Sequence, residues 1–353
     1  MKTDWPRRAA ALAAHLPCDT LHPAVLAWAA GRTRAARGAW AVAFSGGADS
    51  LALLLLLWAH FPARRARLVA LHFNHRLRGR AADADEAFCR RVAGALGVTF
   101  RRACWRRPGK NAGEAAARAV RFAFMESEQK RTRAPALWLG HQQDDIAETM
   151  LMRLARGSGT AGLAAPRPVQ PMPGGRMHLR PLLTLKKAGL AAALRAVGAP
   201  WREDATNAGG DFFRNRVRRA VLPAWRRAAG GRDALAGAAL ARERLEEDDA
   251  ALEAWADRFG ALDRGGRRLN IAALAGAPRA VVRRALHRWL LAQPDTGDLS
   301  RQGFDQLLAA VERGAATRFS LGRAGFAVLR RGRLLYEKAR RGRQRLKGKR
   351  KRS

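Results

Sequence analysis

The sequence contains few cysteines. Only Cys18, Cys89 and Cys104 occur among its 353 residues, and they are widely spaced. The odd number argues against a disulfide framework, and the spacing excludes a Cys-x-x-Cys metal or redox pair. We therefore expect a protein of a reducing compartment, the cytoplasm.

Acidic residues are also scarce. The chain has 29 Asp and Glu against 67 Lys and Arg, which gives a formal net charge of +38 at pH 7. Such an excess favours a polyanionic partner, and nucleic acid is the obvious one. Most of the excess is Arg, and since Ala and Gly are also abundant, a GC-rich coding bias could produce it. The charge supports a nucleic-acid partner without proving it.

Long apolar segments are missing as well. The longest apolar run, Leu51 to Phe61, is too short to cross a membrane, so no membrane association is predicted. Residues Met1 to Pro17 faintly resemble a signal peptide, but their apolar part is short and His15 interrupts it. An amphipathic surface helix is expected there instead.

Two common phosphate-binding motifs do not explain the most distinctive turn of the chain. A short apolar run, Trp40 to Phe44, stops at Ser45-Gly46-Gly47, and a second apolar run follows; neither a Walker-type P-loop nor Gly-x-Gly-x-x-Gly occurs there. The pattern predicts a strand, a tight turn and a helix whose first amides form an anion-binding nest. A glycine turn that merely begins a helix is the alternative. The predicted phosphate-binding residues are Ser45, Gly46, Gly47, Ala48, Asp49 and Ser50.

A second buried strand, Leu68 to Phe73, ends in the polar segment His72 to Arg78. Polar residues at the carboxyl end of a parallel strand face the ligand crevice of a doubly wound sheet. His72, His75 and the later His141 could form a metal site. Hydrogen-bonded crevice histidines that contact a nucleotide are favoured, because no carboxylate completes a zinc pattern nearby.

Arg118 lies four residues after Glu114 on the next expected helix. This spacing fits a solvated ion pair on the helix surface. It fits equally well an arginine that points at phosphate, with Glu114 fixing its rotamer. Spacing alone leaves both readings open.

A third buried strand, Ala136 to Leu139, leads through Gly140 and His141 into a helix with three early carboxylates, Asp144, Asp145 and Glu148. Helix capping accounts for one acid, whereas a hard cation such as Mg²⁺ accounts better for the group. Because the phosphate loop would lie beside this strand, the predicted metal ligands are Asp49, Asp144 and Asp145.

The remaining segments are predicted in less detail. Residues 156–163 form a glycine-rich candidate substrate lid, 166–173 a proline-rich connector, and 213–219 the start of a basic helix that ends near Pro223. Further helices are expected over 233–259, 279–293 and 300–314, with Ser300 as a cap and Gly314 as a stop. Short strands follow at 318–321, 326–329 and 333–336, and then a basic tail from residue 338 that is disordered by default.

Together these motifs resemble the tRNA(Ile)-lysidine synthetases, which belong to the N-type ATP pyrophosphatases of the PP-loop superfamily. The match covers roughly the first 225 residues, with Gln142 and Gln143 as modest departures. The longer members carry a further C-terminal domain. The matching segments are Ser45 to Ser50, His72 to Arg78, Glu114 to Arg118, Gly140 to Thr149, Arg156 to Leu163, Arg180 to Leu183, Asp204 to Asn207 and Arg214 to Arg218.

The resemblance implies a Rossmann-like α/β fold with a doubly wound, mainly parallel sheet, followed by a helical domain and a small β unit. The expected division is 1–37, 38–225, 226–314, 315–337 and 338–353, with the helical domain binding tRNA. The implied reaction uses ATP and Mg²⁺ to adenylylate the wobble cytidine of tRNA(Ile) with a CAU anticodon, after which L-lysine displaces AMP. A homodimer is left open.

The same resemblance distributes the roles among residues. Catalysis falls to Asp49, Asp144 and Arg118, and ATP contacts to the phosphate loop with His72, Gly140 and His141. A tRNA thiolase would need paired cysteines, and a noncatalytic binding module would have no use for the acids. The implied tRNA contacts are Arg156, Ser158, Asn207, Arg214, Asn215 and Arg218.

Overall fold

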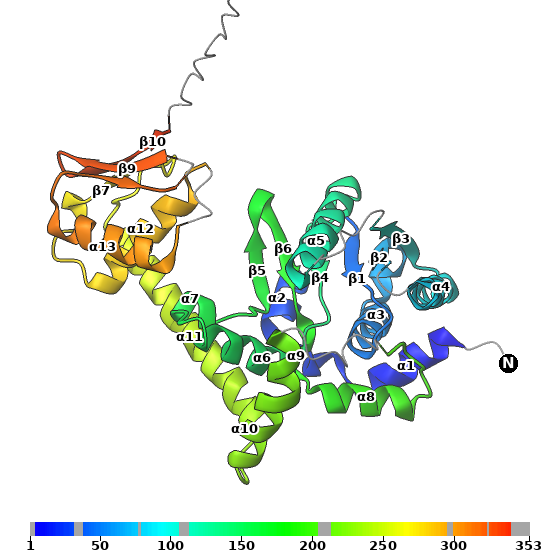
Figure 1. The fold of residues 1–353 in the computed structure, drawn as a ribbon. Coiled ribbons are helices and arrows are strands. Elements are labelled where there is room, and N and C mark those ends of the chain that lie inside the picture. Colours follow the sequence, from blue (N-terminus) through cyan, green and yellow to red (C-terminus); the bar gives the residue numbers. More distant parts are fainter. Residues whose placement is uncertain are drawn as a thin grey trace, which may run out of the picture. The chain divides into compact units, whose positions relative to one another are not determined.

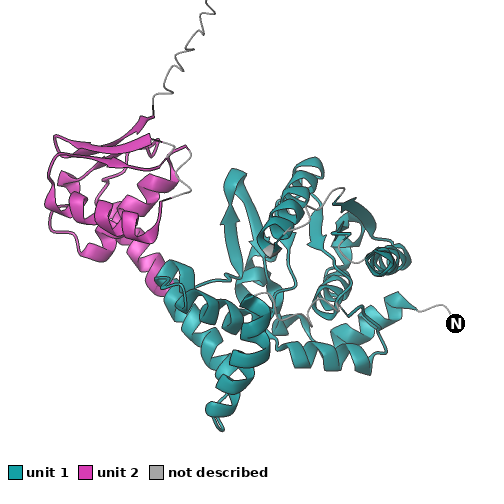
Figure 2. Ribbon diagram, viewed as in Figure 1, with its two compact units in different colours: residues 1–246 teal, residues 247–353 magenta. Residues whose placement is uncertain are grey.

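The computed structural model describes residues 4–31, 38–76, 79–105, 113–203, 213–294, 299–322 and 325–339. The chain divides into two compact units, residues 1–246 and 247–353 (Figure 2). This division lies inside the long helix α11 (Ala234–Arg258), whereas the sequence predicted a boundary after residue 225. The roles assigned to the expected domains stay predictions.

A six-stranded sheet organises the first unit (Figure 1). Only β5 runs antiparallel to its neighbour, so the prediction of a doubly wound, mainly parallel sheet is confirmed. The strand order reverses between β1 and β4, and ligands bind at such a switch point, outside the carboxyl ends of the strands. In spatial order the strands are β3 (Thr99–Cys104), β2 (Leu68–Asn74), β1 (Trp40–Ala43), β4 (Ala136–Trp138), β6 (Arg176–Leu179) and β5 (Val169–Met172).

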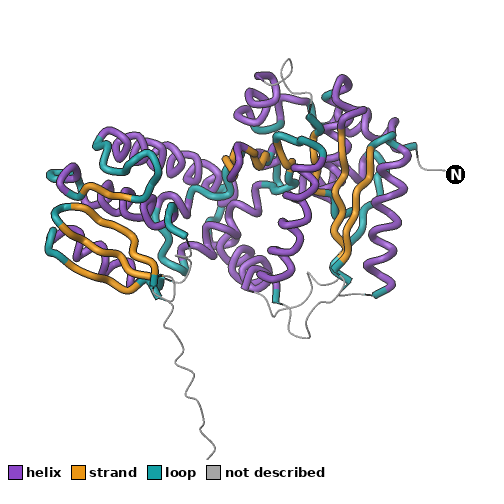
Figure 3. Tube along the Cα trace, turned by 90° about the horizontal axis from the view of Figure 1, so that it is seen from above, coloured by secondary structure: helices purple, strands orange, loops and turns teal. Residues whose placement is uncertain are grey.

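Helices cover both faces of this sheet (Figure 3). Since side chains alternate along a strand, Trp40 and Val42 pack on the α3 side while Ala41 packs on the α5 side. The helices of the unit are α1 (Trp5–His15), α2 (Pro23–Gly31), α3 (Ala48–His60), α4 (Arg80–Ala95), α5 (Glu114–Arg131), α6 (Gln143–Leu154), α7 (Thr160–Leu163), α8 (Lys187–Ala196), α9 (Phe213–Arg216) and α10 (Leu222–Ala228).

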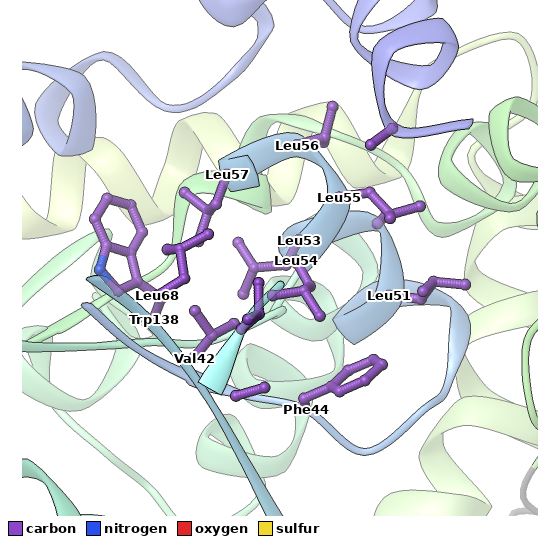
Figure 4. Packing of buried hydrophobic residues seen from close by; sticks show 14 of the residues in the cluster. Val42, Phe44, Leu51, Leu53, Leu54, Leu55, Leu56, Leu57, Leu68 and Trp138 are labelled. Carbon is purple, nitrogen blue, oxygen red and sulfur yellow. The ribbon is translucent and has the colours of Figure 1, made fainter. Parts of the chain in front are cut away.

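Helix α3 lies at the centre of the larger core (Figure 4). Every residue from Leu51 to Leu57 is fully buried, and α1 packs Trp5, Ala9 and Leu12 into the same cluster. Burying a leucine side chain contributes about 1.5–3 kcal/mol. The position of α3, and of the loop that precedes it, is therefore strongly determined.

The edge hairpin β5–β6 was not predicted. The sequence indicated a proline-rich connector over 166–173, but Val169 to Met172 form a strand that pairs with β6, with Pro171 opposite Met177. Proline is tolerated on an edge strand because its missing N–H faces no further neighbour. The connector prediction was wrong for this stretch.

The basic helix that begins at Phe213 does not end near Pro223 as predicted. It continues through a π-helical turn, Val217–Val221, into α10. Proline has no N–H to donate and its ring crowds the carbonyl four residues earlier, and a π turn relieves both by widening the helix. The helix therefore continues to Ala228.

In the second unit, two helices and an antiparallel sheet of order β7-β10-β9-β8 enclose a separate core with Trp289 fully buried. The hydroxyl of Ser300 accepts from the amide of Gly303, and Gly314 ends α13 with a φ of 66°, so both predicted boundaries are confirmed. The elements are β7 (Arg268–Asn270), α12 (Arg279–Leu291), α13 (Arg301–Arg313), β8 (Thr317–Ser320), β9 (Gly325–Arg330) and β10 (Arg333–Lys338).

Two further predictions concern the basic tail and the lack of a membrane-spanning segment. Most of the basic tail, from residue 340, lies outside the described residues. No helix in the described part of the chain is both long and apolar enough to cross a membrane.

The loops that follow β1 and β4 approach closely at Gly140. A Cβ atom on Gly140 would lie 2.9 Å from the backbone oxygen of Asp49 and 3.2 Å from the amide nitrogen of Ser50. Both contacts are with backbone, which cannot move aside cheaply. Gly140, predicted as a nucleotide contact, has a packing role that brings the two loops together.

We therefore expect Gly140→Ala to lower the free energy of unfolding by about 1–3 kcal/mol, because the added methyl group forces the loops apart. Gly189→Ala is a matched control in helix α8, where a Cβ would have nothing within 4 Å. That variant should be neutral or up to about 1 kcal/mol more stable. Urea unfolding measures both, and a Gly140 variant as stable as the control would contradict the packing role.

Candidate functional site

The loop between β1 and α3 is folded around the hydroxyl of Ser50. This hydroxyl donates to the carbonyl of Gly47 at 3.0 Å and accepts from the amide of Ser45 at 3.2 Å. Gly46 has a φ of 90°, and a Cβ there would lie 2.9 Å from the sulfur of Cys89. Only glycine fits this position, because both the backbone angle and the available space exclude a side chain.

Helix α3 begins without a side-chain cap. Its N-cap residue is Gly47, whereas α6 and α13 begin with a glutamine and a serine that accept from their first amides. The first amides of a helix without such a cap are available to an anion, and the helix dipole favours one there. This agrees with the predicted phosphate loop at Ser45 to Ser50.

Asp49 extends from the first turn of α3 into a region with other acids. Its Oδ1 is buried and has no hydrogen-bond partner among the described residues. Burial raises the pKa of this carboxyl to about 6, with a further contribution from Asp145 and a smaller one from Asp144, against the lowering effects of Lys187 and Arg218. The structure thus brings together the three acids that the sequence predicted.

Two arginines neutralise part of this acidic group. Arg214 is paired with Asp145, and it donates to Glu148 at 2.9 Å. Arg218 is also paired with Glu148, which is fully buried. Both arginines were predicted to contact tRNA, but in the structure they point into the protein. Their contact with RNA stays a prediction that this geometry does not favour.

Helix capping occupies further oxygens. Asp145 Oδ2 accepts from the amide of Gln142 at 3.0 Å and completes a capping box with that residue. Asp144 Oδ2 accepts from the amide of Lys187 at 2.9 Å. Capping and ion pairing therefore account for more of the acids than the sequence indicated.

The residues present fit a single hard cation held by few protein ligands. No cluster of three or more metal-binding side chains occurs among the described residues. Mg²⁺ needs only one or two carboxylates when substrate phosphates supply further oxygens. Asp49, with its unpartnered oxygen, and Asp144 meet that need. The assignments of Asp49, Asp144 and Asp145 as its ligands all stay predictions.

His72 is a buried, neutral histidine that supports the loop. Its Nδ1 lies 3.0 Å from the carbonyl of Phe44, so Nδ1 carries the hydrogen and donates. Burial lowers its pKa, and its ring stacks on Phe100. This geometry matches a hydrogen-bonded crevice histidine rather than a metal ligand.

His141 is fixed by the buried Arg180, which the sequence analysis placed in a matching segment without giving it a role in the site. Arg180 Nε donates to His141 Nδ1 at 3.1 Å, and its other nitrogens donate to the Arg167 carbonyl and the Gln170 side chain. Burial and the nearby charges, first Arg180 and then Arg214, hold the pKa of His141 well below its usual value. His141 is therefore neutral, with its hydrogen on Nε2, and Nε2 can donate but cannot accept a proton.

Arg118 is exposed on α5, with its guanidinium 4.8 Å from the centre of the Phe122 ring. Its charge also lowers the pKa of His141, as does that of Arg121. The side chain of Glu114 lies outside the described residues, so the choice between an ion pair and a phosphate contact stays open. The shared effect on His141 places both arginine charges near that ring.

Arg202, which the sequence did not single out, covers the phosphate loop. Its amide donates to the carbonyl of Gly46 at 2.9 Å, and its Nε donates to Asp85 at 2.7 Å. The chain then enters residues 204–212, outside the described part, which include the predicted tRNA contact Asn207. No motif marked Arg202, because its contacts join segments far apart in the sequence.

The predicted lid after α6 is an ordered turn. The amide of Ser158 donates to the Arg153 carbonyl at 3.0 Å, the guanidinium of Arg153 donates to Gly162, and α7 follows. Arg156 is exposed on this loop, whereas the predicted tRNA contact Asn215 is buried. The roles of Arg156, Ser158 and Asn215 stay predictions.

Comparison with known families gives two matches. Residues 27–225 match the family model of a PP-loop domain, and residues 269–335 match that of a TilS substrate binding domain. A tRNA(Ile)-lysidine synthase of Methylobacterium nodulans is 40% identical over 305 residues, covering 82% of this chain and 87% of the relative. One of Geobacter sulfurreducens is 37% identical over 281 residues, covering 75% of this chain.

The chain spans 57% of the Geobacter relative, and 40% and 39% of two further relatives of the same name. Among solved structures, the U34-tRNA thiolase NcsA of Methanococcus maripaludis superposes with a TM-score of 0.50 at 16% identity, covering 68% of this chain and 78% of the thiolase. At that identity the likeness concerns the fold alone.

The raised pKa of Asp49 predicts a pH-dependent effect on stability. The folded value of about 6 lies above the ordinary 3.8, so ionising Asp49 above pH 6 costs the folded state roughly 3 kcal/mol. Asp49→Asn should therefore raise the melting temperature at pH 8, and this gain should vanish as the pH falls toward 4. Thermal unfolding across this range checks it, with the exposed Asp19→Asn as control. A gain that is equal at both pH values would contradict a strained carboxylate.

The Arg180 contact predicts a single tautomer for His141. In ¹⁵N spectra at pH 7, the Nδ1 of this residue should be unprotonated and its Nε2 protonated. Arg180→Met removes the donor and a nearby positive charge, so the tautomers should mix and the pKa should rise. Arg176→Met, at the start of the strand that ends just before Arg180, is the matched control and should leave the His141 signals unchanged. A protonated Nδ1 in the unmodified protein would refute the assignment.

Proposed function

Because this chain belongs to the tRNA(Ile)-lysidine synthase family, we propose that it joins L-lysine to C2 of the wobble cytidine in tRNA(Ile) with a CAU anticodon, at the expense of ATP. The C2 oxygen of the cytidine attacks the α-phosphate of ATP and pyrophosphate leaves. The lysine ε-amine then attacks C2, AMP leaves with the oxygen, and the amine loses a proton.

The observation that carries this proposal is the buried Asp49 carboxylate at the uncapped start of α3, within the segment that matches a PP-loop domain. A buried carboxylate without a hydrogen-bond partner destabilises the folded protein, and such a group is typical of a site where a bound ligand supplies the missing interaction. A bound ATP with Mg²⁺ would supply that compensation.

The chain's own residues divide the work. The amides at the start of α3 bind phosphate oxygens, and His141 Nε2 donates to a ligand oxygen. The positive charges of Arg118, Arg121 and Arg180 favour an anionic ligand near His141, because charge developing on a leaving phosphate is stabilised by donors already in place. Mg²⁺ held by Asp49 and Asp144 would offset charge on the pyrophosphate.

The lysine amine must be deprotonated before it attacks. His141 is unsuited to accept the proton, since Nδ1 accepts from Arg180 and Nε2 already carries hydrogen. Glu148 is paired with two arginines. His72, whose Nε2 is unprotonated when Nδ1 donates to Phe44, another carboxylate of the site and water are the acceptors that are left.

A sulfur-transferring function is disfavoured by the cysteines. Cys89 is buried with its thiol near the Phe44 carbonyl, and burial raises its pKa. Burial also raises the pKa of Cys18. Sulfur transfer needs accessible thiolates.

The proposed function includes a cytoplasmic location. Whether the protein forms a homodimer is not tested.

Incubation of a CAU-anticodon tRNA(Ile) transcript with ATP, Mg²⁺ and lysine should add the mass of lysine minus water to one cytidine, as mass spectrometry of its nucleosides would detect.

Asp49→Asn and Asp144→Asn should each reduce turnover by ~10²-fold or more and leave tRNA affinity nearly unchanged, because each removes a charge needed at the adenylylation step. Near-normal turnover in either variant at saturating Mg²⁺ would refute its role, and no modified cytidine would refute the function.

A further inference from the structure

A basic hollow of about 490 Å³ lies on the first unit where α8 begins and α10 gives way to α11. Four of the residues that line it are cationic and one is acidic. The continuation of the helix through the π turn brings the α10 arginines to this place. The lining residues are Lys186, Pro223, Arg226, Arg227, Gly230, Arg232, Asp233 and Ala234.

The acid does not neutralise the hollow. Asp233 is paired with Lys186, and its other oxygen accepts from the amide of Ala236 at 3.2 Å. Arg226, Arg227 and Arg232 are exposed, and none of the three forms an ion pair within the described ranges. Arg214 and Arg218 differ, since they are paired with buried acids. The hollow therefore presents three guanidinium groups to an external anion.

The hollow is connected to the acidic site through the first turn of α8. Lys186 lines it, and the amide of the next residue, Lys187, donates to Asp144. The charge of Lys187 also acts on Asp49. The hollow and the acidic site therefore meet at two neighbouring residues where α8 begins.

We infer that this hollow is a binding subsite for RNA backbone phosphates that flank the reacting nucleotide. This inference rests on the proposed function and adds where the substrate's backbone is held. Guanidinium groups match phosphate oxygens in a bidentate geometry, and several exposed groups in a row suit a polyanion. A small free anion would need buried donors, and the lining arginines are exposed.

The test compares two double variants with the same change of charge. Arg226→Gln with Arg227→Gln removes two cations of the hollow. Arg91→Gln with Arg101→Gln removes two exposed cations on α4 and on the edge strand β3, which form no ion pair within the described part of the chain. Fluorescence titration of a CAU-anticodon tRNA(Ile) transcript between 50 and 200 mM salt is measured for both on the complete chain. Glutamine is a good helix former, and thermal melting verifies folding.

The hollow variant should bind the transcript several-fold more weakly, and its slope of log affinity against log salt should be shallower by up to ~0.9 for each lost phosphate contact. The control variant should bind like the unmodified protein. Equal losses in both variants, or no loss in either, would overturn the inference, because binding would then depend on overall charge or on another surface.

A competition assay distinguishes RNA from a small anion. If free ATP displaces a fluorescent nucleotide less well from the hollow variant than from the control, the hollow binds nucleotide phosphates and the RNA assignment is wrong. Failure of the proposed function is separate, since it shows as absent lysidine in the unmodified protein. Failure of this inference leaves lysidine formation intact and makes the tRNA affinities of the two variants equal.

Discussion

Complete burial of α3 is the constraint on which the site depends. Seven consecutive residues, Leu51 to Leu57, have no exposed surface, so the helix can neither rotate nor slide without opening the core. Its first turn is fixed in consequence, and with it the amides that follow Gly47. An anion site of this kind is organised before its ligand arrives, which lowers the entropic cost of binding.

The same rigidity explains the strained acid. Asp49 lies two residues before Leu51 in the first turn of α3, so the buried helix fixes its backbone beside the neighbouring acids. Its pKa of about 6 records that cost. Gly140 contributes by letting the loop after β4 approach the Asp49 backbone, which brings α6 and its acids close. The first unit stays folded despite the free-energy cost of ionising Asp49, because burial of the leucine core stabilises the unit by far more.

Local chemistry made part of this predictable from sequence. The glycine turn, the buried strands, the Ser300 cap and the Gly314 stop each depend on a few adjacent residues, whereas the class of the sheet was implied by the family resemblance. The predictions failed where a distant partner decides. Val169 to Met172 form a strand because they pair with β6. The helix continues past Pro223 through a π turn, which no residue type in the sequence indicates.

The arginines show most clearly what composition cannot determine. The sequence analysis placed Arg214 and Arg218 on a basic helix and gave both as tRNA contacts, because arginines on a helix cannot be assigned to an external phosphate or to an internal acid until the acids across from them are known. The arginines differ in how far they are buried. Arg180 is buried and fixes the tautomer of His141, Arg214 pairs with Glu148, and Arg226 is exposed to solvent. The count of 67 Lys and Arg therefore overstates the number of cations available to a partner, since some of them are paired with buried carboxylates. Arg226, Arg227 and Arg232 are exposed and form no ion pair within the described residues, so they can bind an RNA partner. Their position next to the acidic site supports that role better than the number of arginines in the chain does.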